Sequence, residues 1–402
     1  MNISKKKIVF DLVLNMIATA VPIAILQLVI YPLISQDVTV EGYGMMVTVI
    51  SLLTVISNTL GNTLNNIRLL NDGKYKKKRI VGDFNQLLLR ESIISLIIVG
   101  SFSIVLFRQI SLIEFLLIEV IGMLMVFHSY FIVDFRLKLD YNAIVWNNVQ
   151  LALGYFVGYL TFFLTGIWEL VYLFGYGFSL IYIFRKTKLW REPLLKTIYW
   201  HEILKDTFLL LISGVLGSLL NYSDKIIIYP MIGAEAVTIY YIATLLGKLV
   251  SMVIGPINSV MLSYIVKLKQ ISNKILTLIL CSAVMIAVVG YIICLTFGEV
   301  VLKYIYPQHF SEVVKYMPIT SATAMIMMLI SVLYPFVLKF CKMKWQVIID
   351  ATSLICYVCL GVAFYQFYGL YGFCIGVLAA FLIKFFIMFI IFIKQKTVTS
   401  NV

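Results

Sequence analysis

Apolar segments long enough to cross a bilayer recur along the chain, and they constrain its fold more than any other feature. A membrane-spanning helix needs about 20 mostly apolar residues, and in lipid only helices or closed barrels satisfy every backbone hydrogen bond. Hydrophobic residues make up 62% of the 402 positions and charged residues only 13%, so an ordinary soluble domain is excluded. The sequence predicts an all-α integral membrane protein with twelve transmembrane helices, at 8–34, 43–64, 84–107, 112–133, 143–164, 168–184, 207–229, 237–262, 275–297, 317–340, 346–366 and 369–393.

The basic residues test the number of spans, because one helix too many or too few would move every later loop across the membrane. With twelve spans, 25 of the 32 lysines and arginines fall in loops assigned to the cytoplasm, and only Arg108, Lys303 and Lys315 fall on the opposite side. This positive-inside bias predicts a multi-pass protein of the cell inner (cytoplasmic) membrane with both termini in the cytoplasm. The net charge of +13 is explained by basic loops facing an anionic leaflet, without a nucleic-acid partner.

A faint internal duplication relates the two halves of the chain. The sequence Tyr-Pro-Leu-Ile at 31–34 recurs as Tyr-Pro-Met-Ile at 229–232, an offset of 198 residues, and Gly166-Ile167 recurs as Gly369-Leu370 at an offset of 203. An even number of spans in each copy gives both copies the same membrane orientation. We therefore expect two parallel six-helix repeats, a plan known from transporters.

The repeat sets the expected domain boundaries. An N-terminal six-helix lobe is predicted at 1–185 and a C-terminal six-helix lobe at 207–402. Residues 186–206 between them form a basic cytoplasmic linker that contains Pro193. Its amphipathic flanks favour a short helix on the membrane surface, with a plain solvated linker as the alternative.

Polar side chains recur at helical spacing in the first two spans of each half. In lipid such stripes must face other helices or water, and their symmetry predicts one central cavity shared by both halves. Ser, Thr and Gly also serve ordinary close helix packing, so only asparagines and charges exceed that explanation. The candidate substrate-binding residues are Lys248, Lys225, Asn58, Asn258, Asn62, Asn221 and Lys384.

Lys248 is the first choice among these residues, because it lies nearly halfway along its predicted span. A lysine there costs about 2.5–3.5 kcal/mol on insertion scales, which favours a cavity cation. Lys225 could instead snorkel or pair with the adjacent Asp224, and Lys384 could snorkel or line the inner vestibule.

Other ionisable residues in the spans are weaker candidates, supported by position alone. Arg90 and Glu91, at the cytoplasmic end of the third span, are interpreted as a boundary pair, and His128 as a satisfied polar group between helices, with a proton relay as the alternative. The candidates for ion coupling are Asp11, Asp224 and Glu119.

Short motifs at the span junctions carry a family resemblance. Asp-Lys-Ile-Ile-Ile at 224–228 is followed by Tyr-Tyr-Ile-Ala at 240–243, Gly-Tyr-Gly lies at 42–44 in the first half, and Tyr-Gly-Leu-Tyr-Gly-Phe at 368–373 opens the last span. These segments resemble bacterial polysaccharide-export flippases of the O-antigen and capsule type, often called Wzx, in the superfamily that includes multidrug and toxin extruders. Ile239 departs from the pattern, since relatives often carry glycine there.

The resemblance implies a V-shaped fold of two six-helix lobes. It also implies alternating access that moves undecaprenyl-diphosphate-linked oligosaccharide repeat units to the outer leaflet for surface polysaccharide biosynthesis. The expected partners are this lipid-linked substrate, membrane lipids, and a polysaccharide polymerase and glycosyltransferases of the same pathway. Lys248 and Lys225 would face the diphosphate, while Asn58, Asn62 and Asn258 would bond the sugar hydroxyls.

Two other functions remain open at this point. A multidrug or cation antiporter of the same superfamily would favour acids in the cavity, whereas spans seven, eight and twelve contribute three lysines against Asp224. A membrane enzyme such as a polysaccharide polymerase would present a sizeable extramembrane loop, but the longest outer loop runs only from about 298 to 316. No catalytic residue, cofactor or metal site is expected, and the sequence lacks the G-x-x-x-x-G-K-[ST] motif of P-loop ATP hydrolysis.

Overall fold

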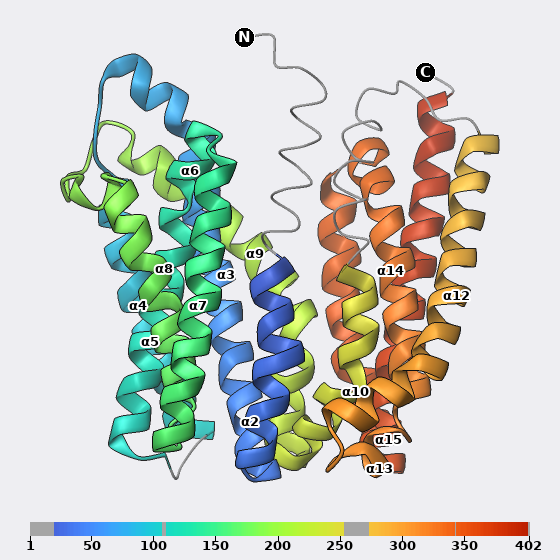
Figure 1. Ribbon diagram of the computed structural model, residues 1–402. Helices are drawn as coiled ribbons and strands as arrows, with labels where there is room; N and C mark the ends of the chain where they lie inside the picture. Colours follow the sequence, from blue (N-terminus) through green and yellow to red (C-terminus); the bar gives the residue numbers. More distant parts are fainter. Residues whose placement is uncertain (1–19, 107–109, 253–272, 342, 401–402) are drawn as a thin grey trace. The chain divides into compact units, whose positions relative to one another are not determined.

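The computed structural model describes residues 20–106, 110–252, 273–341 and 343–400, and these residues form helices and no strands (Figure 1). The predicted all-α class is therefore confirmed. The principal elements up to residue 232 are η1 (Leu26–Ile30), α2 (Tyr31–Asp37), α3 (Val40–Lys78), α4 (Phe84–Leu106), α5 (Leu112–Phe131), α6 (Val133–Lys138), α7 (Tyr141–Thr165), α8 (Glu169–Lys186), η2 (Leu189–Arg191) and α9 (Trp200–Ile232). They are followed by α10 (Ala234–Met252), α12 (Asn273–Ile305), α13 (Phe310–Val313), α14 (Met317–Phe340) and α15 (Met343–Ser400).

Eight helices in the described ranges are long and apolar enough to cross a membrane, and α9 makes nine if its two arms, bent by 60°, count as one span. One of the eight, within α15, contains two arms, because Tyr368 and Gly369 leave the helical conformation. The predicted spans at 168–184 and 237–262 correspond to α8 and α10, which do not meet the same measure of length and hydropathy. The chain is thus a multi-pass membrane protein, and each predicted span overlaps a helix or helix arm over the part of it that the structure describes.

Several helices extend beyond their predicted ends. The second span was expected to end at residue 64, but α3 continues to Lys78 and ends at Arg79 with a left-handed φ of 53°. Its added turns carry the salt bridge between Lys76 and Asp72, at 2.7 Å with i,i+4 spacing. Basic side chains also suit the negative end of a helix dipole. The charges that ended the apolar run therefore did not end the helix.

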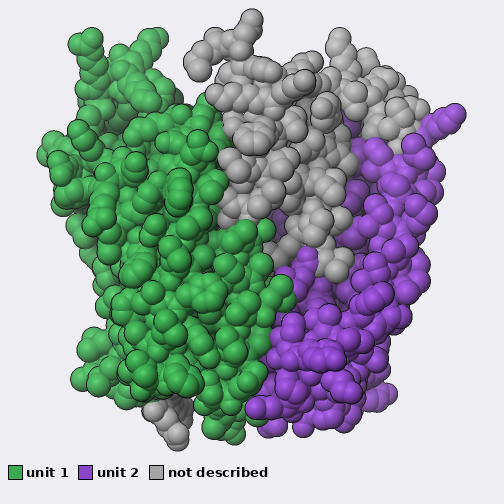
Figure 2. Space-filling view, viewed as in Figure 1, with its two compact units in different colours: residues 1–230 green, residues 231–402 purple. Residues whose placement is uncertain are grey.

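The chain divides into two compact units, Met1–Pro230 and Met231–Val402, which are coloured separately in Figure 2. The first unit includes nearly all of α9, which the sequence analysis assigned to the C-terminal lobe. Residues 187–199 form a 3-10 turn and irregular backbone, and not the expected surface helix. The lobe boundaries at 185 and 207 come from the sequence repeat and stay a prediction.

Corresponding helices pack in the same pairs inside each unit. In the first unit α3, α4 and α8 all contact α5. In the second unit α10, α12 and α15 all contact α14. The predicted repeat equates α10 with α3, α12 with α4, and α14 with α5, so the pairing within each unit follows the sequence duplication.

Two helical hairpins occupy corresponding places in these units. Gly166 ends α7 with a φ of 74°, and Gly369 separates the arms of α15 with a φ of 59°. These positive φ values favour glycine. A Cβ on Gly158 would lie 2.5 Å from a backbone atom of α8, and one on Gly376 would lie 2.4 Å from the Leu360 oxygen. Both hairpins thus bring backbones into direct contact through small residues.

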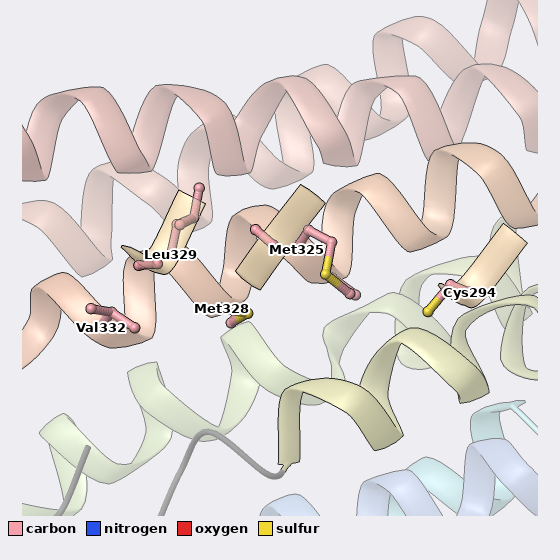
Figure 3. Packing of buried hydrophobic residues seen from close by; sticks show 8 residues of the cluster. Cys294, Met325, Met328, Leu329 and Val332 are labelled. Atoms are coloured by element: carbon pink, nitrogen blue, oxygen red, sulfur yellow. The ribbon is translucent and has the colours of Figure 1, made fainter. Parts of the chain in front are cut away.

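One cluster of buried apolar residues in the second unit lies between α12 and α14. Figure 3 shows Cys294 together with Met325, Met328, Leu329 and Val332, all of which are buried. Methionine side chains are flexible enough to fill irregular space. The buried thiol of Cys294 belongs to this packing, and all six cysteines are free.

Candidate functional site

Two asparagines of α3 bond to each other on its partly exposed face. The Asn62 Nδ2 donates to the Asn58 Oδ1 at 2.9 Å, and Asn58 is half-buried while Asn62 is exposed. Other polar side chains of the same stripe bond the backbone of α3. The Ser51 hydroxyl, for example, donates to the Val47 oxygen at 2.7 Å. The two asparagines thus differ from the hydroxyl groups of the stripe, which bond backbone oxygens of their own helix.

Lys225 lies in α9 beside a carboxylate. Its Nζ is 2.9 Å and 3.0 Å from the two carboxylate oxygens of Asp224, and both residues are buried. The Tyr222 ring centroid lies 5.9 Å from the same Nζ. Tyr222 in turn interacts electrostatically with Tyr31 and Tyr176, so α9 brings an ion pair close to a group of tyrosines.

Lys384 pairs with an acid in the second unit. Its Nζ lies 3.0 Å from the Asp350 Oδ1, and the two side chains are 12% and 22% exposed. The pair joins the two arms of α15, which the turn at Tyr368 and Gly369 folds against each other. The two roles expected for Lys384 were snorkelling and lining the inner vestibule. An ion pair with Asp350 was not predicted.

The remaining predicted site residues are placed less fully. Lys248 is half-buried on α10, four residues before Met252. Asn221 lies in the α9 backbone, and its side chain is outside the described structure. Asp11 and Asn258 lie outside the described residues altogether.

The charge balance in the spans needs a correction. The sequence analysis weighed three lysines against Asp224 alone. The structure adds Asp350, so Lys225 and Lys384 each have a carboxylate within 3.0 Å. Two of the three lysines are thus paired with carboxylates in the described structure, so the comparison is three lysines against two acids.

A polar network between α5, α7 and α8 holds His128. The Asn147 side-chain nitrogen lies 3.2 Å from the His128 Nε2, and the Ser179 hydroxyl donates to the Asn147 Oδ1 at 2.6 Å. The Tyr176 ring packs edge-on against the imidazole, with the two ring centroids 5.2 Å apart. This geometry agrees with the interpretation of His128 as a satisfied polar group between helices.

Tyrosines extend this network toward α2, and sequence reasoning missed them. The hydroxyls of Tyr31 and Tyr172 are hydrogen-bonded to each other, and Tyr172 meets Tyr155 edge-on at 5.9 Å. Tyr31 belongs to the repeated Tyr-Pro motif, which is the one signal that could have drawn attention to it.

The acids of α4 and α5 differ in their surroundings. Glu119 is half-buried, and a Cβ on Gly100 of α4 would lie 2.8 Å from its Oε1. Arg90 and Glu91 do not form the expected boundary pair, because the Arg90 guanidinium lies over the Trp200 ring at 4.7 Å while Glu91 is buried. Consecutive residues on a helix point about 100° apart, which separates their side chains.

Residues 187–199, called the interlobe linker from here on after the predicted lobes, lie within the first unit and are bonded to its helices. The Arg68 Nη1 donates to the Glu192 Oε2 at 2.7 Å and to the Tyr130 hydroxyl at 2.8 Å. The Asn85 side chain donates to the backbone oxygens of Leu189 and Glu192, both at 2.9 Å. Sequence reasoning treated Arg68 as a loop cation and missed this role.

A second fastening lies a few residues further along the interlobe linker. Asp83 is fully buried, and its Oδ1 accepts from the Thr197 backbone nitrogen at 2.7 Å. The Asp83 backbone nitrogen donates to the Leu195 oxygen at 2.8 Å, and the Tyr75 hydroxyl also bonds the carboxylate. We call the contacts of Arg68, Asn85 and Asp83 with this segment the linker clamp.

Comparisons with known proteins place the fold. No family model and no curated protein matches the sequence. A multidrug resistance MATE family transporter of the MOP superfamily, solved facing inward, superposes with a TM-score of 0.69 at 15% identity, over 96% of this chain and 98% of that chain. The lipid II flippase MurJ in an inward closed conformation gives 0.68 at 12% identity, over 98% of this chain and 89% of that chain.

The chain shares the fold of these solved membrane transporters. An outward-facing MATE family transporter also superposes, with a TM-score of 0.62 at 13% identity, over 98% of this chain and 96% of that chain. At these identities the comparisons establish fold and leave the substrate open. Among the described residues, no group of three or more His, Cys, Asp or Glu side chains could hold a metal ion.

Proposed function

We propose that this protein is a flippase that moves undecaprenyl-diphosphate-linked oligosaccharide across the cytoplasmic membrane by alternating access. The observation that carries the proposal is the placement of lysines in the span helices. Lys225 is buried, and Lys248 and Lys384 are half-buried. Ammonium groups at such positions suit an anionic headgroup, because a diphosphate that leaves water needs cations to replace its hydration.

The two carboxylate partners are compatible with such a substrate. A lysine buried alone is costly, and a nearby acid offsets part of that cost in the absence of substrate. Diphosphate oxygens can replace the Asp224 or Asp350 carboxylate as the partner of the ammonium group, since charge-assisted bonds of Lys to phosphate and to carboxylate are of similar kind. The pairs would then hold the lysines ready between transport events.

The fold and the asparagines support the same proposal. One protein with this fold is a lipid II flippase, so the fold serves the movement of a lipid substrate. Asn58 and Asn62 present amide groups on a partly exposed face of α3, and amides can donate to and accept from sugar hydroxyls. Both termini would lie in the cytoplasm, and a polymerase and glycosyltransferases would act on either side of the transport step.

A second candidate function is multidrug export. Solved MATE family multidrug transporters have this fold. Asp224 and Asp350 also place carboxylates in the span helices, where they could pair with a cationic drug instead of a lysine. The two candidates differ in the sign of the charge that is transported.

Deletion of the gene separates these candidates. A flippase mutant should accumulate the complete lipid-linked oligosaccharide in the cytoplasmic leaflet and lose surface polysaccharide, with unchanged susceptibility to cationic drugs. Leaflet location is measured by the access of a sugar-specific lectin to spheroplasts and to inside-out vesicles. Normal surface polysaccharide together with increased drug susceptibility would reject the flippase in favour of the exporter.

A further inference from the structure

Glu91 of α4 is a buried carboxyl group that nothing in the fold accounts for. It is 3% exposed, and neither of its carboxylate oxygens has a hydrogen-bond partner in the described structure. The hydroxyl of the adjacent Ser92 does not serve it, because that group donates to the Leu88 oxygen at 2.7 Å. Buried polar groups in native proteins nearly always have partners. A buried carboxyl group with no hydrogen-bond partner on either oxygen is therefore a strong sign of function.

This carboxyl group lies on the side of α4 that packs against α5. Ser95, one turn beyond Glu91, faces Gly122 of α5, so the Glu91 side chain lies on the same buried face of α4. It acts electrostatically on Tyr130 of α5. The Tyr130 hydroxyl accepts a hydrogen bond from Arg68 of α3, which also binds Glu192 of the interlobe linker.

Three other titratable side chains on α4 and α5 make their contacts away from Glu91. Arg90 stacks on Trp200, and the Glu119 carboxylate faces Gly100, nine residues or about 13 Å further along α4. His128 of α5 bonds Asn147 of α7. Glu91 thus interacts electrostatically with Tyr130, whose hydroxyl is bonded to Arg68, and Arg68 in turn bonds Glu192.

The chemistry of this environment selects a proton as the ligand of Glu91. A carboxylate buried without a partner costs several kcal/mol, whereas the neutral acid carries no such charge penalty. A hard metal cation would require several oxygen ligands around it, and in the described ranges Glu91 belongs to no group of three or more His, Cys, Asp or Glu side chains that could hold one. Glu91 is therefore the neutral acid in this conformation.

We propose that Glu91 is a proton-binding site and that its ionisation loosens the linker clamp. When the acid releases its proton to water, a carboxylate charge appears beside Tyr130. The Arg68 guanidinium is then drawn toward Glu91 and away from Glu192, and its Nε, which has no hydrogen-bond partner in the described structure, is available to the new carboxylate. The inference rests on the proposed function only in treating release of the interlobe linker as a step of transport.

Infrared spectroscopy of the purified protein tests the proton site directly. A protonated carboxyl group in a dry interior gives a C=O stretch that is separate from the carboxylate bands. We expect the wild type to show this band at neutral pH, and Glu91→Gln to lose it. The control Glu119→Gln should keep it. An unchanged band in Glu91→Gln, or a wild-type band that disappears on adding sodium at constant pH, would overturn the proposal.

Hydrogen exchange of the interlobe linker tests the coupling. After correction for the intrinsic pH dependence of exchange, wild-type amides at 187–199 should exchange faster as the pH rises, and those of Glu91→Gln should show no such change. Tyr130→Phe keeps the carboxyl group and removes the hydroxyl that connects it to Arg68, so it should retain the infrared band and lose the pH response. The same pH response in all three proteins would refute the coupling.

Neither measurement contains a transport substrate. A failed flippase assay combined with the expected infrared and exchange results would reject the proposed substrate and leave the proton site standing. A successful flippase assay without the expected infrared and exchange results would reject the proton site and leave the proposed substrate standing.

Discussion

At the scale of single residues, Lys248 is the sharpest test of how the substrate is bound. Hydrogen bonds to charged groups contribute about 1.5–3 kcal/mol, so Lys248→Ala should lower transport about ten- to a hundredfold at normal protein level. Lys248→Arg should retain most activity because it keeps the charge. Complementation of a deletion strain, scored by surface polysaccharide, provides the measurement. The exposed Lys303→Ala is the matched control, and full export by Lys248→Ala would exclude Lys248 from the site.

His309 gives a pH prediction outside the spans. It is 6% exposed, and its Nε2 has no hydrogen-bond partner in the described part of the chain. Burial lowers the pKa of the imidazole, and the nearby Glu312 opposes this only in part. The unfolded chain therefore takes up a proton more readily than the folded chain, and stability falls as the pH drops below the ordinary histidine pKa of about 6.5.

Thermal unfolding of His309→Gln between pH 7.5 and 5 checks this sign. The variant should lose less stability on acidification than the wild type, while the exposed His201→Gln should behave as the wild type does. An identical acid response in wild type and His309→Gln would contradict the assignment.

The sequence predicted some residue-level features and could not predict others. Asp224 was visible as a possible partner of Lys225 because the two are adjacent, and the structure pairs them. Asp350 was not visible as the partner of Lys384, because the register of the α15 hairpin brings together residues 34 positions apart. Glu91 was misinterpreted because position along a span does not show which face of the helix a residue occupies.

At the scale of elements, the α7–α8 hairpin should be sensitive to one added methyl group. A Cβ on Gly154 would lie 2.4 Å from the Phe174 oxygen, whereas one on Gly177 would meet nothing within 4 Å. Overpacking typically costs 1–3 kcal/mol, so Gly154→Ala should lower the unfolding temperature measurably. Gly177→Ala should be neutral or slightly stabilising, because alanine favours helix. Equal unfolding temperatures for the two variants would contradict the close backbone contact.

The linker clamp should also be testable by proteolysis. Breaking a buried ion pair by removing one partner costs about 3–5 kcal/mol, so Arg68→Ala should free the interlobe linker and speed tryptic cleavage at Lys196. Lys74→Ala breaks the exposed pair with Glu202, whose side chains are 50% and 49% exposed, and should have little effect. Cleavage rates measured on purified protein decide between a fastened and a loose linker, and similar rates in both variants would argue against the clamp.

Element ends show where sequence patterns stop being informative. The apolar runs overlap helices wherever the structure describes them, because a membrane-spanning helix requires such a run. They could not locate the end of α3, since a helix that leaves the bilayer continues on charged residues such as Lys76 with Asp72. The interlobe linker was basic and amphipathic enough to suggest a surface helix, but its backbone is instead held by Asp83 and Asn85.

At the scale of the whole molecule, the all-α multi-pass fold was predictable and the substrate was not. Composition and the positive-inside rule indicated the class, and the repeat of Gly166 at Gly369 marked hairpins that both units contain. The fold is shared with multidrug transporters and with a lipid flippase, so it does not determine the charge of what is moved. We expect that information in a few side chains of the span helices, which the Lys248 variants test.

The most direct test of the account is leaflet exchange by the purified protein. Proteoliposomes would contain an undecaprenyl-diphosphate oligosaccharide labelled with a fluorophore on its sugar, and a membrane-impermeant quencher would be added outside. The account predicts that wild-type protein makes the inner-leaflet lipid accessible to the quencher and that Lys248→Ala does so far more slowly. No exchange of this lipid, together with transport of a cationic drug in the same proteoliposomes, would contradict it.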